Sequence, residues 1–110
     1  MSNKRSKKYE TAVAKDLGGG SVQPASGALP FWKNDVRSDN WLVEHKYTDA
    51  KSYSVKKSLF EDLTKNAFRA GKLPVVVVEF PNRPELRVAI IRYEEFLELD
   101  EYLTKEANGQ

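Results

Sequence analysis

The sequence predicts an α/β fold in which helices flank one mixed sheet, and three observations predict it. Residues 73–80, LPVVVVEF, form a continuous apolar run, as in strands that are buried on both faces. A helical pattern over residues 55–70 separates this run from a second strand pattern at residues 41–47, which is the order of a parallel crossover unit. Residues 6–17 carry another apolar helical stripe ahead of both strands.

The first half of the chain predicts one helix and three strands. Glycines after residue 17 end the helix over residues 6–17. Its apolar stripe consists of Tyr9, Val13 and Leu17, with Ala12 beside them. Residues 21–30 are rich in Pro, Gly and Ser and predict a short strand and a loop. Residues 35–37 and 41–47 predict an antiparallel hairpin with a short turn.

The second half predicts two helices and two strands. Ser54 is the expected N-cap of the helix over residues 55–70, and Gly71 is its expected stop. The apolar stripe of this helix is Val55, Leu59, Leu63, Ala67 and Ala70. After the buried strand, residues 87–93 predict another strand and residues 94–104 a last helix. This last helix is expected to give the core Phe96, Leu97 and either Tyr102 or Leu103.

Length and composition limit the possible functions. A chain of 110 residues predicts a single domain over residues 1–110, and we expect residues 1–6 and 105–110 to be flexible ends. The absence of Cys and the single His exclude a disulfide framework, a cysteine zinc site and a centre of several histidines. Any metal must therefore have oxygen ligands. No apolar run approaches the length of a membrane span, and the N-terminus lacks an apolar signal region, so we expect a cytoplasmic protein without membrane contact.

The sequence lacks the common nucleotide and hydrolase motifs. Neither GxxxxGK[ST] nor GxGxxG occurs, so a glycine-rich phosphate loop is unsupported. No GxSxG occurs, and His45 is the only possible base for a serine nucleophile. The net charge is only +2, but basic residues lead the chain and acidic residues crowd its end, which predicts one basic side. A basic tail with a solvated acidic helix face would explain the same charge pattern.

Charged residues at Asp35, Glu44 and Lys46 form the candidate site. Glu44 and Lys46 are two apart on one strand and so share a face of the sheet, and the hairpin brings Asp35 near them. Two carboxylates on adjacent strand ends can hold Mg²⁺, while water and a phosphate oxygen complete its octahedron. Lys46 would position or deprotonate the attacking water, or stabilise the pentavalent transition state. Glu10 and Ser26 would join them if the first helix and the loop pack over the hairpin.

Simpler interpretations of these residues stay open. Glu44 and Lys46 could be an ion pair on an edge strand, and Asp35 a turn former. Glu10 could face solvent on its helix, and Ser26 could only form a turn. Several lysines could line a DNA path through phosphate contacts, or could be ordinary solvated cations. They include Lys33, Lys51, Lys56 and Lys57.

The pattern of Asp35, eight intervening residues and Glu44-His45-Lys46 resembles the D-(x)n-(D/E)-x-K signature of the PD-(D/E)XK nuclease superfamily. Glu10 in the first helix and the Pro24 to Gly27 stretch fall in the order seen in Holliday junction resolvases of archaea and in similar small phage proteins. The resemblance covers residues 7–92. It departs from those resolvases at Asn34, where they often have Gly, and in the short turn after Asp35.

The resemblance implies a restriction-endonuclease-like αβββαβ core and Mg²⁺-dependent hydrolysis of DNA phosphodiesters, with Mn²⁺ able to substitute. It implies that Glu10, Asp35 and Glu44 bind the metal, that Lys46 is catalytic, and that Ser26 contacts phosphate or the site loop. A homodimer that cuts branched DNA, in a prokaryotic or phage-infected cell, is the expected form. We therefore expect a structure-selective endonuclease, most specifically a Holliday junction resolvase. The alternatives are a related nuclease for flaps or plain DNA, and a non-catalytic DNA-binding module of the same fold.

Overall fold

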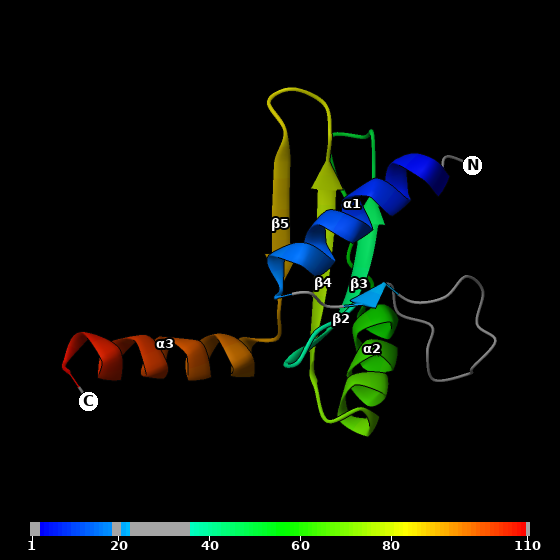
Figure 1. Cartoon of the computed structure of the whole chain (residues 1–110). Coiled ribbons are helices and arrows are strands. Elements are labelled where there is room, and N and C mark those ends of the chain that lie inside the picture. The colour runs from blue at the N-terminus through cyan, green and yellow to red at the C-terminus, as the bar shows by residue number, and fades with distance from the viewer. Residues whose placement is uncertain (1–2, 19–20, 23–35, 110) are drawn as a thin grey trace.

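A computed structural model of the chain describes residues 3–18, 21–22 and 36–109. Within these ranges, helices and strands follow one another in the order predicted from the sequence. They are α1 (Asn3–Asp16), β1 (Ser21–Val22), β2 (Val36–Arg37), β3 (Trp41–Tyr47), α2 (Lys57–Arg69), β4 (Leu73–Phe80), β5 (Leu86–Ile90) and α3 (Tyr93–Ala107). The predicted α/β class, with a mixed sheet and flanking helices, is therefore confirmed (Figure 1).

The strands form one five-stranded sheet in the order β1-β2-β3-β4-β5. Strands β2 and β3 pair antiparallel, with Val36 opposite Val43, so the predicted hairpin is confirmed. Strands β3 and β4 pair in parallel along their full lengths, from Trp41 opposite Leu73 to Tyr47 opposite Glu79, which confirms the crossover through α2. Strand β3 therefore has a neighbour on either side, whereas β5 pairs antiparallel with the far side of β4.

Two helices cover opposite faces of the sheet because alternate residues of each strand point to opposite sides. Helix α1 packs Val13 and Ala14 against one face, in a cluster that also contains Val36, Val43, Val75 and Val77. Helix α2 packs Leu63 and Ala67 against the other face, in a cluster that also contains Leu42, Val76 and Val78. The run Pro74 to Glu79 is buried throughout, as predicted for a strand between two helix layers.

Helix α2 begins later than the sequence predicted. Its N-cap is Lys56 rather than Ser54, because Lys56 has an extended backbone and its carbonyl accepts the first helical N–H, from Leu59, at 3.1 Å. Val55 accordingly precedes the helix and is exposed, so its expected place in the apolar stripe is wrong. The predicted stop is confirmed: Gly71 has φ +69°, a conformation that glycine adopts at little cost, and Lys72 N–H returns to the Ala67 carbonyl.

Helix α3 differs most from expectation. It leaves the sheet after β5 and extends away from the other layers (Figure 1). The side chains expected to enter the core are exposed instead: Phe96, Leu97, Tyr102 and Leu103. Glu95 is the buried residue of α3. Strand β5, which precedes the helix, ends at Ile90, three residues before the predicted end. Helices α1 and α3 also reach into residues 1–6 and 105–110, the expected flexible ends.

Candidate functional site

Glu44 and Lys46 form an ion pair on the central strand of the sheet. They alternate with the α1-facing Val43 and His45 and so lie on the face that α2 covers. The Lys46 Nζ lies 3.0 Å from a Glu44 carboxylate oxygen, with 36% of the lysine side chain and 16% of the glutamate side chain exposed. Strand β3 pairs with β2 at Leu42 and Val43 and with β4 along its whole length, so β3 as a strand is not at the edge of the sheet, while Glu44 and Lys46 themselves pair with β4.

Three of the predicted site residues, Ser26, Lys33 and Asp35, lie outside the described residues. The described part of the hairpin still bears on Asp35. Val36 follows Asp35 in the sequence and pairs with Val43, and Glu44 follows Val43.

Glu10 lies on α1, which covers the face opposite to the one that carries Glu44. It is half-buried, one turn before the buried Ala14. Its neighbour Tyr9 contacts Tyr47, the last residue of β3, with 5.5 Å between ring centroids. Helix α1 therefore passes the carboxyl end of β3, but Glu10 and Glu44 approach the sheet from different sides, and a shared ion between them stays a prediction.

The predicted DNA-contacting lysines that the structure describes are Lys51, Lys56 and Lys57. All three are exposed, and they lie in the connection from β3 to the first residue of α2. Lys57 has a weak partner in Glu61, at 3.9 Å, and both side chains are largely solvated. This segment follows the strand end that carries Lys46, so the cations lie along the chain immediately after the candidate site.

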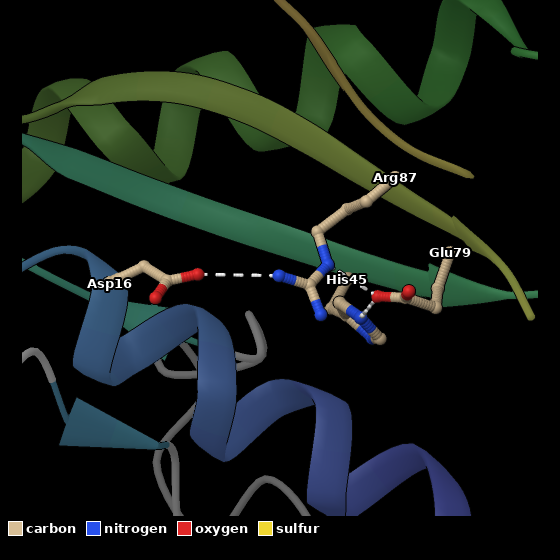
Figure 2. A network of polar contacts seen from close by, with 4 residues as sticks. All are labelled: Asp16, His45, Glu79 and Arg87. Atoms are coloured by element: carbon tan, nitrogen blue, oxygen red, sulfur yellow. Dashed lines mark hydrogen bonds and ion pairs between the residues drawn. The ribbon is translucent and has the colours of Figure 1, made fainter. Parts of the chain in front are cut away.

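A second polar cluster lies on the α1 face of the same sheet. Figure 2 shows His45, Glu79, Arg87 and Asp16 directed toward one another from β3, β4, β5 and α1. The Arg87 Nε donates to a Glu79 carboxylate oxygen at 2.6 Å, and its Nη1 donates to Asp16 at 3.3 Å. The same Glu79 oxygen lies 3.7 Å from the His45 Nε2. The side chains of His45 and Glu79 are 0% and 5% exposed.

Burial controls the protonation of His45. Desolvation disfavours the imidazolium and lowers the pKa of His45 below its usual 6.5, although the Glu79 carboxylate acts in the opposite direction. Arg87 also lowers the pKa of His45, because its positive guanidinium, which lies beside the same carboxylate, disfavours a second positive charge on the imidazole. The imidazole is therefore neutral at neutral pH, while the Arg87 guanidinium balances the buried charge of Glu79.

The sequence carries a signal for this cluster in the polar residues of its buried strands. Glu79 ends an otherwise apolar run, and His45 alternates onto the same face as Val43. A carboxylate in a strand buried on both faces needs a partner, and the parallel pairing of β3 with β4 places His45 near Glu79. Alternation along β3 accordingly turns His45 away from Glu44 and into the interior.

The described residues do not by themselves complete a metal centre. Within residues 8–18 and 36–109, no three His, Cys, Asp or Glu side chains come together as a ligand group. The set predicted from the sequence includes Asp35, which falls outside those ranges. What the described residues do provide is one carboxylate, paired with one ammonium group, at the partly open surface of a central strand.

Comparison with known proteins adds no family to this description. A scan of protein-family models finds none that matches the chain, and a search of curated proteins finds no significant match. The resemblance to PD-(D/E)XK nucleases therefore depends on this chain's own residues. Among the described helices, none combines the length and apolar character that crossing a bilayer requires.

Proposed function

We propose that this chain is a Mg²⁺-dependent endonuclease that hydrolyses phosphodiester bonds in branched DNA, with the four-way junction as its substrate. The observation that carries the proposal is the Glu44–Lys46 pair, at 3.0 Å on the central strand β3. Opposite charges on a strand inside a sheet are costly to desolvate, and the partial exposure of Glu44 and Lys46 suits a site that meets an anionic substrate.

The element order supports a nuclease core. A helix, three strands, a helix and a strand occur in the order αβββαβ. Glu10 lies on its first helix, Asp35 precedes its second strand in the sequence, and Glu44 and Lys46 lie on its third strand. The proposed restriction-endonuclease-like core is this arrangement, with β3 and β4 parallel and α2 across one face. Strand β5 and helix α3 would then be additions to the core.

The donor set fits a hard divalent cation. Asp35, Glu44 and Glu10 offer carboxylate oxygens, the ligands that Mg²⁺ and Mn²⁺ prefer. Val36 and Val43 are partners in the hairpin. Asp35 precedes Val36 in the sequence and Glu44 follows Val43, so both carboxylates adjoin this pair along the chain. When bound, the cation would supply positive charge beside the scissile phosphate and would acidify the attacking water.

Lys46 would have two effects at this site. Before substrate binds, its ammonium group lies against the Glu44 carboxylate and holds that side chain in one orientation. With a phosphodiester present, the same ammonium group would donate to a phosphoryl oxygen or to the attacking water, where negative charge develops in the transition state. Its 36% exposed side chain leaves it reachable from solvent.

The substrate and assembly follow from symmetry. A four-way junction offers two opposed strands, and two copies related by a two-fold axis would present one site to each. Lys51, Lys56 and Lys57 would bind the phosphate backbone without regard to sequence. Lys33 and Ser26 would add contacts from the loop that precedes β2.

Incubation of purified protein with a four-way junction, a flap and a linear duplex, each with and without Mg²⁺, tests the proposal. We expect cutting of the junction only with the metal, and a loss of about 10²–10³-fold or more in Asp35→Asn and Lys46→Ala, because each removes charge that acts in the transition state. The matched controls are Asp39→Asn in the exposed turn and Lys105→Ala near the end of α3, which should cut as the wild type does.

Three other results would contradict the proposed function or narrow it. Binding of DNA without cutting, at any metal concentration, would make the chain a non-catalytic binding module. Equal cutting of linear duplex and junction would leave a nuclease without branch selectivity. Metal-dependent cutting that survives both substitutions would remove Asp35 and Lys46 from the mechanism.

A further inference from the structure

Helix α3 carries an apolar surface without a covering layer in the described structure. Six large apolar side chains along it are 43% to 70% exposed: Tyr93, Phe96, Leu97, Leu99, Tyr102 and Leu103. At 100° per residue, Phe96, Leu97 and Leu103 share one side of the helix with a single carboxylate, Asp100, among them. Glu94, Glu98 and Glu101 lie together on another side. The helix is thus amphipathic, yet its apolar side faces solvent.

The exposed area is large for a single chain. An aromatic side chain covers about 150–250 Å², so the exposed parts of Tyr93, Phe96 and Tyr102 alone amount to roughly 400 Å². The largest apolar patch of a typical monomer is about 300–600 Å², and the three leucines add to the aromatic area here. A standard protein–protein contact takes about 800 Å² from each partner, which this helix and its surroundings can supply.

An apolar cleft of about 390 Å³ adjoins the helix. Leu99 lines it, so the cleft and the apolar side of α3 form one continuous surface. The other walls come from α1, β3, β4 and β5 and from the residues that directly follow α1 and β5. They include Val13, Leu17, Trp41, Val77 and Ile91. Arg87 and Asp16, which are paired at 3.3 Å, lie at its polar side.

The start of α3 is fixed to the body. The Arg92 Nε donates to the Glu95 carboxylate at 2.7 Å, and its guanidinium group lies 5.0 Å from the centre of the Phe68 ring on α2. Glu95 is buried at 3% exposure, and the hydrogen bond to it raises the pKa of Arg92. The direction in which α3 projects is therefore set by packing at its first turn.

Charge favours the chain itself as the partner. Helix α3 has six carboxylates and one ammonium group, a formal charge of −5. The whole chain carries +2, so the remaining residues carry +7. The acidic helix is therefore complementary in net charge to the rest of a second copy, which also carries the apolar cleft.

We propose that α3 of one copy lies across the cleft of a second copy, whose own α3 lies across the first, in a closed two-fold dimer. Each copy then gives one helix and receives one, as an isologous contact requires. The resemblance to resolvases implied only that two copies associate. In the proposed dimer, the associating surfaces are specifically α3 and the cleft. The contact does not involve Glu44 or Lys46 and does not depend on the proposed nuclease activity.

Light scattering on a sizing column, without DNA or metal, tests the dimer. We expect the wild type to have twice the 12.5 kDa mass of the chain. Phe96→Glu and Leu103→Glu should each raise the dissociation constant by about 30-fold or more, since each places a charge in an apolar contact. Glu98→Gln, on the acidic side of α3, is the matched control and should stay dimeric. Circular dichroism verifies that each variant is folded.

A cross-linking experiment tests the arrangement, because the chain has no cysteine of its own. Leu103→Cys is placed in one chain and Leu17→Cys in a second chain of different mass, and the mixture is treated with a flexible bismaleimide. We expect a covalent heterodimer, and little product when Glu98→Cys replaces Leu103→Cys. A monomeric wild type at every concentration, a dimer unaffected by both glutamate variants, or cross-linking of Leu103→Cys only to itself would each overturn the proposal.

Discussion

Side-chain alternation along β3 places two different polar sites on the two faces of one strand. Glu44 and Lys46 point toward the α2 layer and remain partly solvated, whereas His45 between them points into the α1 layer and is buried. Each site obeys the same constraint, because a charge that leaves water needs a partner. Lys46 is that partner for Glu44, and Arg87 is that partner for Glu79.

The protonation of His45 makes stability depend on pH. Its folded pKa lies below 6.5, the value expected in the unfolded chain, so the unfolded state takes up the proton first as pH falls. The contribution of His45 to stability is complete above the unfolded pKa and is lost as pH drops from there through the folded pKa. We expect the free energy of unfolding, from urea titrations, to fall as the pH drops from about 7.5 through the folded pKa of His45.

The variant His45→Gln tests whether His45 causes this pH dependence of stability, since glutamine fills similar space and does not titrate. The variant should lose most of the pH dependence in this interval while it keeps the steeper loss at lower pH, where carboxylates are protonated. Equal slopes for the variant and the wild type between neutral pH and about pH 5 would contradict a role for His45.

At the scale of elements, β4 holds the two layers together. Its odd and even valines divide between the α1 and α2 clusters, so a single strand contributes to both cores. Helix α2 packs Leu63 and Ala67, which are 1% and 0% exposed, into the cluster on its own face of the sheet. The same helix also positions Phe68, against which Arg92 packs at the start of α3.

Leu63 is expected to be a main contributor to the α2 core. Leu63→Ala should lower the free energy of unfolding by about 2–5 kcal/mol, because it removes buried methyl groups and leaves a cavity between α2 and the sheet. Leu86→Ala is the matched control: Leu86 is 55% exposed on β5, and its change should stay within about 0.5 kcal/mol. Urea unfolding of both variants measures the difference, and equal losses would contradict the assignment of the core.

At the scale of the whole molecule, charge is divided between a basic body and the acidic helix α3. The lysines after β3 belong to the basic part, and we expect them to set how DNA binding responds to salt. Each phosphate contact that is lost should lower the slope of log K against log salt by about 1. The triple variant Lys51→Ala, Lys56→Ala and Lys57→Ala should therefore bind junction and duplex more weakly and with a smaller slope.

Fluorescence anisotropy at several salt concentrations, without divalent metal, measures this effect. Lys105→Ala is the control, because Lys105 lies near the far end of α3 and pairs with Glu101. A slope unchanged in the triple variant but reduced in the control would place the DNA on the other side of the molecule.

Local patterns in the sequence were sufficient for the elements of the sheet. Residues 41–47 and 73–80 are strands with the predicted bounds, and the order of all elements agrees with prediction. Of the candidate site, the sequence located the Glu44–Lys46 pair and its shared face, because alternation along a strand is a local property. The membership of Glu10, Asp35 and Ser26 stays a prediction, since it depends on how segments distant in the chain approach β3.

The apolar stripe of α3 shows most clearly what sequence periodicity does not predict. Periodicity determined that residues after 93 form an amphipathic helix, but it does not say what that helix packs against. Local patterns are enough to predict the α/β class, the central strand and the neighbouring charges on it. The separate position of α3 (Figure 1) and the convergence of His45, Glu79, Arg87 and Asp16 (Figure 2) depend on contacts between elements, because burial and pairing are set by the three-dimensional register of the chain.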